Sequence, residues 1–547
     1  MRHRKKASGP RSRPPAAAGV EINPQFRRAL DLMEDTGRHV FVTGRAGTGK
    51  STLLEYFRDT TRKRIAVLAP TGVAALNVRG QTIHSFCRFK PGITLDSVKK
   101  LRPAKAGCAG GTGGRSDSGA EVYKKFETIV IDEISMVRAD LLDCVEKFLR
   151  LNGPDPKRAF GGLQMVFIGD LYQLPPVVTS REKGLFSGPY ETPYFFSARA
   201  FQDPRFAMEF VELEKIYRQS EEKFIRLLNA IRNRTVTDGD LARLNENCDP
   251  DFVPPEDELY ITLTSTNDLA SSRNREKIDR LPGRGRAYEG LILGEFDRSS
   301  LPTEERLELK TGAQVMLLTN DPQGRWVNGS IGRVDAIIRE KGADDVVQVE
   351  LLGGLRVDVL PHTWEIYRFA LDEESGNIVS EPVGSFTQYP LRLAWAVTIH
   401  KSQGKTFDRV IIDFGRGTFA HGQAYVALSR CTNLRGLVLK KPVQRGHIRL
   451  DYDIVRFLTR FQYQKADERL SYARKLEMIR EAINEGRDLE ILYLKPDDTK
   501  ARRRIHPESV EMMDFRGKRF EGVSAFCYKR EDTRHFRIDR MLEVKIL

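Results

Sequence analysis

The feature that most constrains the fold is a glycine-rich loop between an apolar segment, His39–Thr43, and a segment of helical composition. The loop reads Gly44-Arg45-Ala46-Gly47-Thr48-Gly49-Lys50-Ser51. In such a loop the glycines let backbone N–H groups curl around phosphates, the lysine reaches the β- and γ-phosphates, and the serine hydroxyl ligates Mg²⁺. A glycine-rich turn before an ordinary helix is the alternative. Because strand, spacing and lysine are all present, the sequence predicts a nucleotide-phosphate site made by Gly44, Ala46, Gly47, Thr48, Gly49, Lys50, Ser51 and Thr52.

Other short apolar segments end, like the first, where the sequence turns to Gly, Asp, Thr or Pro. We predict strands at Arg64–Ala69, Glu127–Ile131, Gln164–Gly169, Leu259–Leu263, Arg409–Phe414 and Gly436–Lys440. Segments of helical composition, such as Ser51–Thr60 and Arg138–Leu151, separate several of them. Continuous apolar strands that alternate with helices predict an α/β fold of parallel sheets covered on both faces, with sites at the C-terminal strand edges.

Two carboxylates and an amide follow other predicted strands. Asp132 and Glu133 come directly after Thr128–Ile131, and Gln173 lies in the phrase Gly169–Pro176. Asp132 is placed to hold Mg²⁺ and Glu133 to polarise an attacking water, while Gln173 can sense the γ-phosphate. A solvated Asp-Glu turn and an ordinary Gly/Pro turn are the alternatives. Beside a phosphate loop the catalytic interpretation is favoured.

Phosphoanhydride hydrolysis also needs positive charge opposite the loop, because negative charge spreads in the transition state. Arg218, in Tyr217-Arg218-Gln219, and Arg430, at the end of Gln423–Arg430, are candidates. Either could form only a surface ion pair in a chain with 89 Lys and Arg residues. These residues alone do not decide between the two interpretations.

Composition limits the class of protein and of partner. The 547 residues are 40% hydrophobic and 30% charged, as in soluble proteins of several domains. No window approaches about 18 apolar residues, and the basic N-terminus leads into Ser, Gly, Pro and Ala, so we expect neither a membrane span nor a secretory signal. A net charge of +14 favours nucleic acid as partner. Six scattered cysteines indicate a reducing, cytoplasmic compartment.

Taken in order, the motifs resemble those of superfamily-one helicases. They read GRAGTGKS, APTGVAALNVRGQTIHSF, DEISM, FGGLQMVFIGDLYQLPPV, YRQ, AVTIHKSQGKT and QAYVALSR. DEISM, FGGLQ and QLPPV are most similar to the Pif (petite integration frequency) family of DNA helicases. The motifs cover roughly residues 23 to 445 in the expected order and spacing.

The resemblance implies two RecA-like motor domains with ATP and Mg²⁺ in the cleft between them and 5′-to-3′ movement on single-stranded DNA. It implies that Arg218 and Arg430 are arginine fingers of the second motor domain. Gln25 is similar to the glutamine that reads adenine, against the alternative of a helix-surface glutamine, and Gly404 to a γ-phosphate contact.

The family pattern also points to DNA contacts. They are Thr71, His84 and Ser85 in the first motor domain, Thr398, His400 and Lys401 in the second, and Asn328 in a small SH3-like subdomain. Hydroxyl, imidazole, amide and ammonium groups that face phosphates bind DNA without reading bases. For the two histidines the alternative is a buried structural role.

The C-terminal segment resembles a WYL domain, through Leu492-Tyr493, Arg504–Pro507, Ala525–Cys527 and Phe536–Arg540. Glu521-Gly522-Val523 stand where that family has its Trp-Tyr-Leu triplet, so this chain departs from the pattern. In the family a basic pocket binds nucleic acid or nucleotides, which makes Arg504, Arg537 and Arg540 candidates against solvated surface charge.

These observations predict the domain boundaries. We expect a disordered basic arm over 1–20, a first motor domain over 21–200 with a flexible insertion at about 88–120, a second motor domain over 201–308 and 390–463, an SH3-like β insertion over 309–389, a helical connector over 464–488 and a WYL-like domain over 489–547.

We therefore predict an ATP- and Mg²⁺-dependent DNA helicase that acts on single-stranded DNA and on tailed or forked duplexes. The resemblance implies work in DNA replication, repair or recombination, with telomere maintenance among the family's roles, on bacterial nucleoid DNA and with replication or repair proteins as partners. The alternatives are a RecD-like subunit of a recombination complex, a non-enzymatic DNA-binding protein and a WYL-type transcriptional regulator, for which no helix-turn-helix segment is found.

Overall fold

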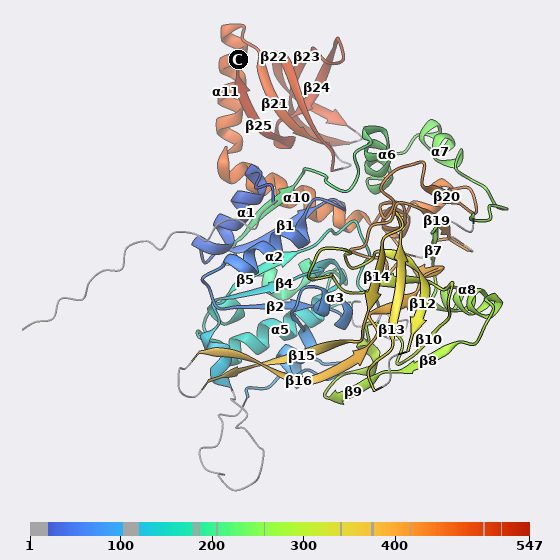
Figure 1. Cartoon of the computed structure of the whole chain (residues 1–547). Coiled ribbons are helices and arrows are strands. Elements are labelled where there is room, and N and C mark those ends of the chain that lie inside the picture. Colours follow the sequence, from blue (N-terminus) through green and yellow to red (C-terminus); the bar gives the residue numbers. More distant parts are fainter. Residues whose placement is uncertain are drawn as a thin grey trace, which may run out of the picture. The chain divides into compact units, whose positions relative to one another are not determined.

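The structure is a computed structural model, shown in Figure 1. It describes residues 20–101, 120–178, 182, 186, 188–203, 206–255, 258–339, 342–372, 377–415, 417–418, 420–495, 498–515 and 517–547. Nearly all of the predicted basic arm and the low-complexity part of the predicted insertion lie outside these residues. The chain forms two compact units, one of residues 1–224, 247–417 and 426–442, the other of 225–246, 418–425 and 443–547. Each is described by itself.

The first unit begins with a parallel sheet of strand order β3-β2-β4-β5-β1-β6. Its strands are β1 (His39–Gly44), β2 (Ile65–Ala69), β3 (Gln81–Thr82), β4 (Thr128–Ile131), β5 (Gln164–Ile168) and β6 (Met208–Leu213). Its helices are α1 (Pro24–Asp35), α2 (Lys50–Thr60), α3 (Gly72–Asn77), α4 (Ile83–Cys87) and α5 (Ala139–Asn152). The central strands are buried along almost their whole length because helices cover both faces, with α1 and α2 on one side and α5 on the other (Figure 1).

The boundary that we predicted at residue 201 is wrong, because β6 belongs to the first sheet. It pairs in parallel with β1 over its whole length, from His39↔Met208 to Gly44↔Leu213. The strand lies at the sheet edge and alternates between buried and half-exposed residues. It therefore lacks the continuous apolar run by which the other strands were recognised.

A second parallel sheet in the same unit has the order β18-β7-β19-β20. Its strands are β7 (Ile261–Thr264), β18 (Ala396–Thr398), β19 (Val410–Asp413) and β20 (Leu437–Leu439), with helices α8 (Asn267–Arg280) and α9 (Gln423–Leu428) nearby in the sequence. The two sheets confirm the predicted α/β class. Seven strands lie within about two residues of their predicted positions.

The β insertion consists of more than the one subdomain that we predicted over 309–389. A five-stranded antiparallel sheet joins β11 (Gln314–Leu317), β12 (Ile331–Ile338), β13 (Val346–Leu351), β14 (Arg356–Val359) and β17 (Leu391–Leu393). A separate sheet joins the long hairpin β15 (His362–Leu371) and β16 (Ile378–Gln388) to β9 (Leu291–Gly294), and β8 (Arg286–Glu289) pairs with β10 (Arg306–Leu309). Strands on both sides of the predicted range thus complete these sheets.

The second unit contains α6 (Glu222–Arg232), of which only the first residues lie in the first unit, α7 (Asp238–Asn245), α10 (Tyr452–Arg469), α11 (Tyr472–Glu485) and a five-stranded antiparallel sheet. The sheet has the order β24-β23-β22-β21-β25, made of β21 (Leu489–Leu494), β22 (Lys500–Phe515), β23 (Lys518–Cys527), β24 (Asp532–Arg537) and β25 (Met541–Ile546). Ile479 and Ala482 of α11 are fully buried against this sheet. The predicted connector is therefore wrong in this part, because α11 is a layer of the C-terminal domain.

No helix in the described part of the chain is both long and apolar enough to cross a bilayer.

Candidate active site

The glycine-rich loop joins β1 to α2 and leaves the first turn of α2 open. Gly47 and Gly49 have φ angles of 78° and 85°, in the left-handed region that only glycine adopts without strain. Gly49 is the N-cap of α2 and has no side chain that could accept a hydrogen bond. The backbone N–H groups of the first helical turn therefore have no side-chain cap. Ser51 and Thr52 are exposed, whereas Thr48 is buried and donates to Arg45 O at 2.9 Å. This arrangement suits a phosphate.

The lysine of the loop is held in place by the loop itself. Lys50 Nζ donates to Gly44 O at 2.7 Å and to Arg45 O at 3.0 Å. Burial lowers the pKa of Lys50, while the nearby Asp170, Glu133 and Asp132 carboxylates oppose that shift. An anion bound in the loop would add to these carboxylates and stabilise the ammonium.

The two carboxylates follow β4, at the C-terminal edge of the first sheet. Burial raises the pKa of Asp132, with Glu133 adding like-charge repulsion, and burial likewise raises the pKa of Glu133. Glu133 also has a φ angle of 49°, a strained conformation for a residue other than glycine. Strain and shifted pKa values are typical of a functional site.

Gln173 is held by a residue that we did not single out. Asp170 follows β5, is 1% exposed, and accepts hydrogen bonds from Gln173 Nε2 at 3.3 Å and from Tyr172 N at 3.1 Å. Because β4 and β5 are neighbours, Asp170 lies close enough to Lys50 and Glu133 to shift their pKa values. Its place at the end of a buried strand was the signal that could have identified it.

Arg218 lies against the phosphate loop. The preceding residue, Tyr217, donates its backbone N–H to Gly47 O at 2.8 Å. The Arg218 guanidinium reaches the carbonyl oxygens of Ser429 at 3.3 Å and Gly404 at 3.5 Å, beside the second sheet. We expected Arg218 on the second motor domain, but its segment follows β6 of the first sheet and joins the two.

Arg430 is 1% exposed, and its guanidinium is hydrogen-bonded mainly to backbone carbonyl oxygens. Its guanidinium donates to Val426 O at 3.0 Å, Lys405 O at 3.3 Å and Ser402 O at 3.4 Å. Its charge nevertheless lowers the pKa of Glu133, against the larger effect of burial. Arg430 therefore both shapes the loop that carries Gly404 and faces the candidate general base.

Three buried polar atoms at this site have no hydrogen-bond partner among the described residues. They are Thr43 Oγ1, Ser135 Oγ and Gln403 Nε2, which belong to the end of β1, to the turn after Glu133 and to the loop before Gly404. Buried groups without partners are rare in folded proteins. Their position fits a bound polar ligand such as a nucleoside triphosphate with Mg²⁺.

The predicted adenine contact, Gln25, lies in the first turn of α1. Its Nε2 donates weakly to Glu214 at 3.5 Å, and the neighbouring Asn23 donates to Tyr217 Oη at 3.2 Å. Tyr217 is 46% exposed, and its ring lies 4.0 Å from a Cβ built on Gly49. An exposed aromatic ring between Asn23 and the phosphate loop is a candidate to stack on a base, which the sequence analysis missed.

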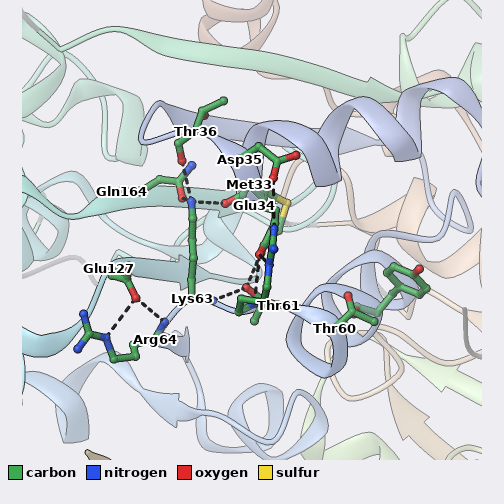
Figure 2. Close-up of polar contacts among 12 residues, drawn as sticks. Met33, Glu34, Asp35, Thr36, Thr60, Thr61, Lys63, Arg64, Glu127 and Gln164 are labelled. Carbon is green, nitrogen blue, oxygen red and sulfur yellow. Dashed lines mark hydrogen bonds and ion pairs between the residues drawn. The ribbon is translucent and has the colours of Figure 1, made fainter. Parts of the chain in front are cut away.

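The other end of α1 is fixed by a half-buried polar network (Figure 2). Lys63 Nζ donates to Met33 O and Thr36 O, both at 2.6 Å, and to Gln164 Oε1 at 2.8 Å. A cation that binds the last carbonyls of a helix also complements the helix dipole. Gln164 is the last residue of the FGGLQ phrase, which explains this phrase as an anchor for the helix that carries Gln25.

The proposed DNA contacts of the first motor domain lie together. β3 pairs with β2 through Ala69↔Thr82, which brings the start of α3 near the start of α4. Thr71 is exposed and caps α3 by accepting from Ala74 N at 3.3 Å, Ser85 is exposed, and His84 is half-buried. Burial lowers the pKa of His84, so its imidazole is neutral at neutral pH.

The corresponding residues of the second motor domain differ in exposure. Lys401 is exposed and His400 half-buried, but Thr398 is only 3% exposed and accepts a hydrogen bond from Lys401 N at 3.3 Å. Thr398 therefore shapes the loop rather than presenting its hydroxyl to a ligand.

Comparison with known proteins supports one family. Residues 24–240 match the family described as PIF1-like helicase, and residues 474–546 match the WYL domain. The chain is 33% identical to the ATP-dependent DNA helicase Pif1 of Bdellovibrio bacteriovorus over 432 residues, which cover 77% of this chain and 88% of that protein. The chain belongs to the PIF1-like helicase family.

Other PIF1-like helicases show the same relationship. The human ATP-dependent DNA helicase PIF1 is 33% identical over 407 residues, and the chain spans 58% of its length. The structure of Bacteroides Pif1 in complex with ADP-AlF₄ has 36% identity and a TM-score of 0.70, over 81% of this chain and 98% of that chain. Bacteroides Pif1 bound to single-stranded DNA has 36% identity and a TM-score of 0.57, over 80% and 96%.

Asn328 is half-buried and holds two elements of this PIF1-like helicase together. Its Nδ2 donates to Asn77 Oδ1 of α3 at 3.1 Å, and its Oδ1 accepts a hydrogen bond from Lys405 Nζ. From the loop between β11 and β12, Asn328 thus contacts α3, which follows β2 of the first sheet, and the loop that follows β18 of the second sheet.

The basic candidates of the WYL domain are largely neutralised. Arg504 is paired with Asp488 at 2.6 Å, and Arg537 with Asp539 at 2.6 Å. Arg540 is half-exposed and forms no ion pair within the described part of the chain. The positive charge that the sequence predicted for this surface is therefore smaller than its arginines suggest.

Proposed function

We propose that the chain is an ATP-dependent DNA helicase that moves 5′ to 3′ along single-stranded DNA. One observation carries the proposal: the phosphate loop, the Asp132–Glu133 pair and two arginines, Arg218 and Arg430, converge between two parallel sheets. That arrangement suits a nucleoside triphosphate whose hydrolysis alters the contact between the sheets. The direction follows from family membership alone.

Each residue of the site has a chemical role in this proposal. The N–H groups of the first turn of α2 and Lys50 hold the phosphates, and Ser51 and Asp132 would hold Mg²⁺, which neutralises phosphate charge. Glu133 accepts the proton of the attacking water, for which its raised pKa is suited. Gln173 orients groups at the γ-phosphate, and Arg218 and Arg430 stabilise the charge of the transition state.

The link to DNA movement passes through Arg218. Its guanidinium binds the carbonyl of Gly404, which lies three residues after Lys401 in the proposed DNA phrase. A γ-phosphate would compete with this carbonyl for the guanidinium. ATP binding and hydrolysis would therefore alternately tighten and release the DNA contacts of the second motor domain.

The decisive experiment is unwinding of matched duplexes that carry either a 5′ or a 3′ single-stranded tail, with and without ATP. We expect ATP-dependent unwinding from the 5′ tail. The Lys50→Ala variant is the matched control, because it removes the phosphate contact while the DNA residues stay intact. Unwinding only from the 3′ tail would contradict the direction, and DNA binding without DNA-stimulated ATP hydrolysis would favour a non-enzymatic DNA-binding protein.

We expect the same chain to act on tailed or forked duplexes in replication, repair or recombination, in the cytoplasm where bacterial DNA lies. A Pif1 helicase structure with 36% identity is described as the structural basis for DNA unwinding at forked double-stranded DNA by two coordinating Pif1 helicases. Nothing in the described structure favours a RecD-like subunit over this assignment.

A further inference from the structure

Lys405 contacts Asn328, and two further basic side chains, Arg392 and Lys401, lie within electrostatic reach of Lys405 or of one another. Lys405 is 9% exposed, and its Nζ donates to Asn328 Oδ1. Arg392 lies on β17, next to Met316 of β11, and its guanidinium donates to the carbonyl of Pro302. Lys401 is exposed and lies within electrostatic reach of Arg392.

This group carries more positive than negative charge. The carboxylate that acts on Arg392 and on Lys401 is that of Glu304, whose side chain is exposed. Lys405 bonds a neutral amide, and burial together with the repulsion of Arg392 lowers the pKa of Lys405 to about 8. A buried cation that has a neutral partner and a like-charged neighbour is costly to keep charged.

We propose that Lys405 and Arg392, with Asn328 between Lys405 and α3, form a subsite for one phosphate of the DNA backbone. The proposal rests on the proposed function and extends it to two further residues. Arg392 lies outside the helicase motifs quoted above, and Lys405 is not among the expected DNA contacts. A phosphate at this point would relieve the repulsion and accept charge-assisted hydrogen bonds from both cations.

The geometry favours DNA over the nucleotide as the source of that phosphate. Asn328 binds Asn77 at the end of α3, the helix that Thr71 caps. Lys405 lies four residues after Lys401 in the phrase AVTIHKSQGKT. The backbone of α3 also passes close to the β insertion, since a Cβ at Gly72 would lie 2.3 Å from Ser300 Cβ. The subsite therefore lies between the two groups of proposed DNA contacts.

Salt dependence of DNA binding tests the proposal. Each phosphate that a protein neutralises on a single strand adds about 0.7 to the slope of log K against log salt. The affinity for a fluorescently labelled oligothymidylate is measured without nucleotide in the full-length chain. Lys405→Met, Arg392→Gln and the double variant should each flatten the slope by about 0.7, because both side chains share one phosphate. Affinity at low salt should fall about tenfold.

Two further variants separate charge from structure. Lys405→Arg keeps the cation and should keep the slope of the unmodified chain. Arg356→Gln removes one positive charge from β14, where Arg356 pairs with Asp335 at 3.4 Å, and should leave the slope unchanged. If Lys405 only ties the loop to the second sheet, Lys405→Met and Asn328→Ala will weaken binding equally and leave the slope as it was, and the proposal fails.

The source of the phosphate is tested in parallel. The affinity for a non-hydrolysable ATP analogue is measured in the same variants without DNA, and we expect its loss to be smaller than the loss of DNA affinity. A loss of analogue affinity with an intact DNA salt slope would assign the basic group to the nucleotide and overturn the proposal. Unwinding by the unmodified chain is scored separately, so failure of the helicase assignment is distinguishable from failure of this subsite.

Discussion

A Cβ atom at Gly47 would lie 2.5 Å from the Cβ atom of Arg218, far inside van der Waals contact. The phosphate loop and the arginine segment thus touch only because residue 47 is glycine. The hydrogen bond from Tyr217 N to Gly47 O, at 2.8 Å, fixes the same contact. Arg218 is consequently placed by the loop that it is expected to assist.

Gly47→Ala should therefore lower the rate of ATP turnover by displacing Arg218 and by straining a residue with a φ angle of 78°. We expect a loss of about 10²-fold or more in kcat, the usual effect of a misplacement of about 1 Å at a catalytic site. Gly37→Ala is the matched control, because a Cβ there meets no atom within 4 Å. Steady-state ATPase assays with DNA check the prediction, and near-normal turnover by Gly47→Ala would contradict it.

Arg218→Ala and Arg430→Ala should both lower kcat, by about 10³-fold or more if each stabilises transition-state charge. The affinity for a non-hydrolysable analogue should change far less, because the benefit arises in the transition state. A rise in the analogue Kd that matches the loss of kcat would indicate ground-state binding instead.

The structure predicts that the two arginine variants differ in stability. Arg218 is half-buried, whereas Arg430 is 1% exposed and donates to three backbone carbonyls. Arg430→Ala removes these three hydrogen bonds: Ser402 O keeps Lys405 N and Val426 O keeps Ser429 Oγ, but Lys405 O loses the donor that Arg430 supplies. The variant should therefore destabilise the fold by about 1–3 kcal/mol. Thermal unfolding of both variants measures this difference, which should be absent or small for Arg218→Ala.

His39 should make the first unit less stable as the pH falls. Its Nδ1 accepts a hydrogen bond from Met165 N at 3.0 Å, its ring stacks on Phe206 at 4.5 Å, and burial lowers the pKa of His39 from 6.5 to about 4. Between these values the unfolded chain binds a proton that the folded chain does not. The contribution of His39 to the free energy of unfolding is therefore complete above pH 6.5. It falls by about 2–3 kcal/mol as the pH is lowered to 4.

The measurement is urea unfolding of the unmodified chain and of His39→Gln across this pH range. Carboxylates titrate in both proteins. The difference between their free energies of unfolding therefore reports on His39 alone. That difference should shrink as the pH falls, since the variant has no imidazole to protonate. A difference independent of pH would show that His39 titrates normally.

The sequence predicted the parts of the fold that depend on local composition. The strand that ends at Gly44 and the strand that ends at Ile131 are continuous apolar runs, so their positions and the polar residues after them could be recognised. β6 could not, because an edge strand alternates in exposure and its pairing with β1 joins residues far apart in the chain. The same holds for Asp170, whose role depends on the adjacency of β4 and β5, and for the contact of Asn328 with Lys405.

The WYL domain offers the last prediction, through Asp488. Its carboxylate accepts from Arg504 Nε at 2.8 Å, His506 Nδ1 at 2.9 Å and Tyr528 Oη at 3.1 Å, and Arg504 lies over the Tyr528 ring at 5.0 Å. Residues 501–547 contain twelve Lys or Arg and eight Asp or Glu, from which one expects a cationic surface. Three of the arginines are neutralised by the carboxylates of Asp488, Asp539, Glu490 and Glu543. Three arginines engaged with DNA would contribute about two units to the slope of log K against log salt. We expect deletion of the domain to flatten this slope by less than that.

Asp488→Asn tests whether this surface contacts DNA at all. The change keeps the size of the side chain and removes the charge that neutralises Arg504. If single-stranded DNA crosses this face, the released guanidinium should engage a phosphate and steepen the slope of log K against log salt by about 0.7. Asp498→Asn, in the turn between β21 and β22, removes one negative charge from the same domain and serves as the control. An unchanged slope in Asp488→Asn, with the circular dichroism of the unmodified chain, would favour a domain that binds a small ligand or a protein instead of DNA.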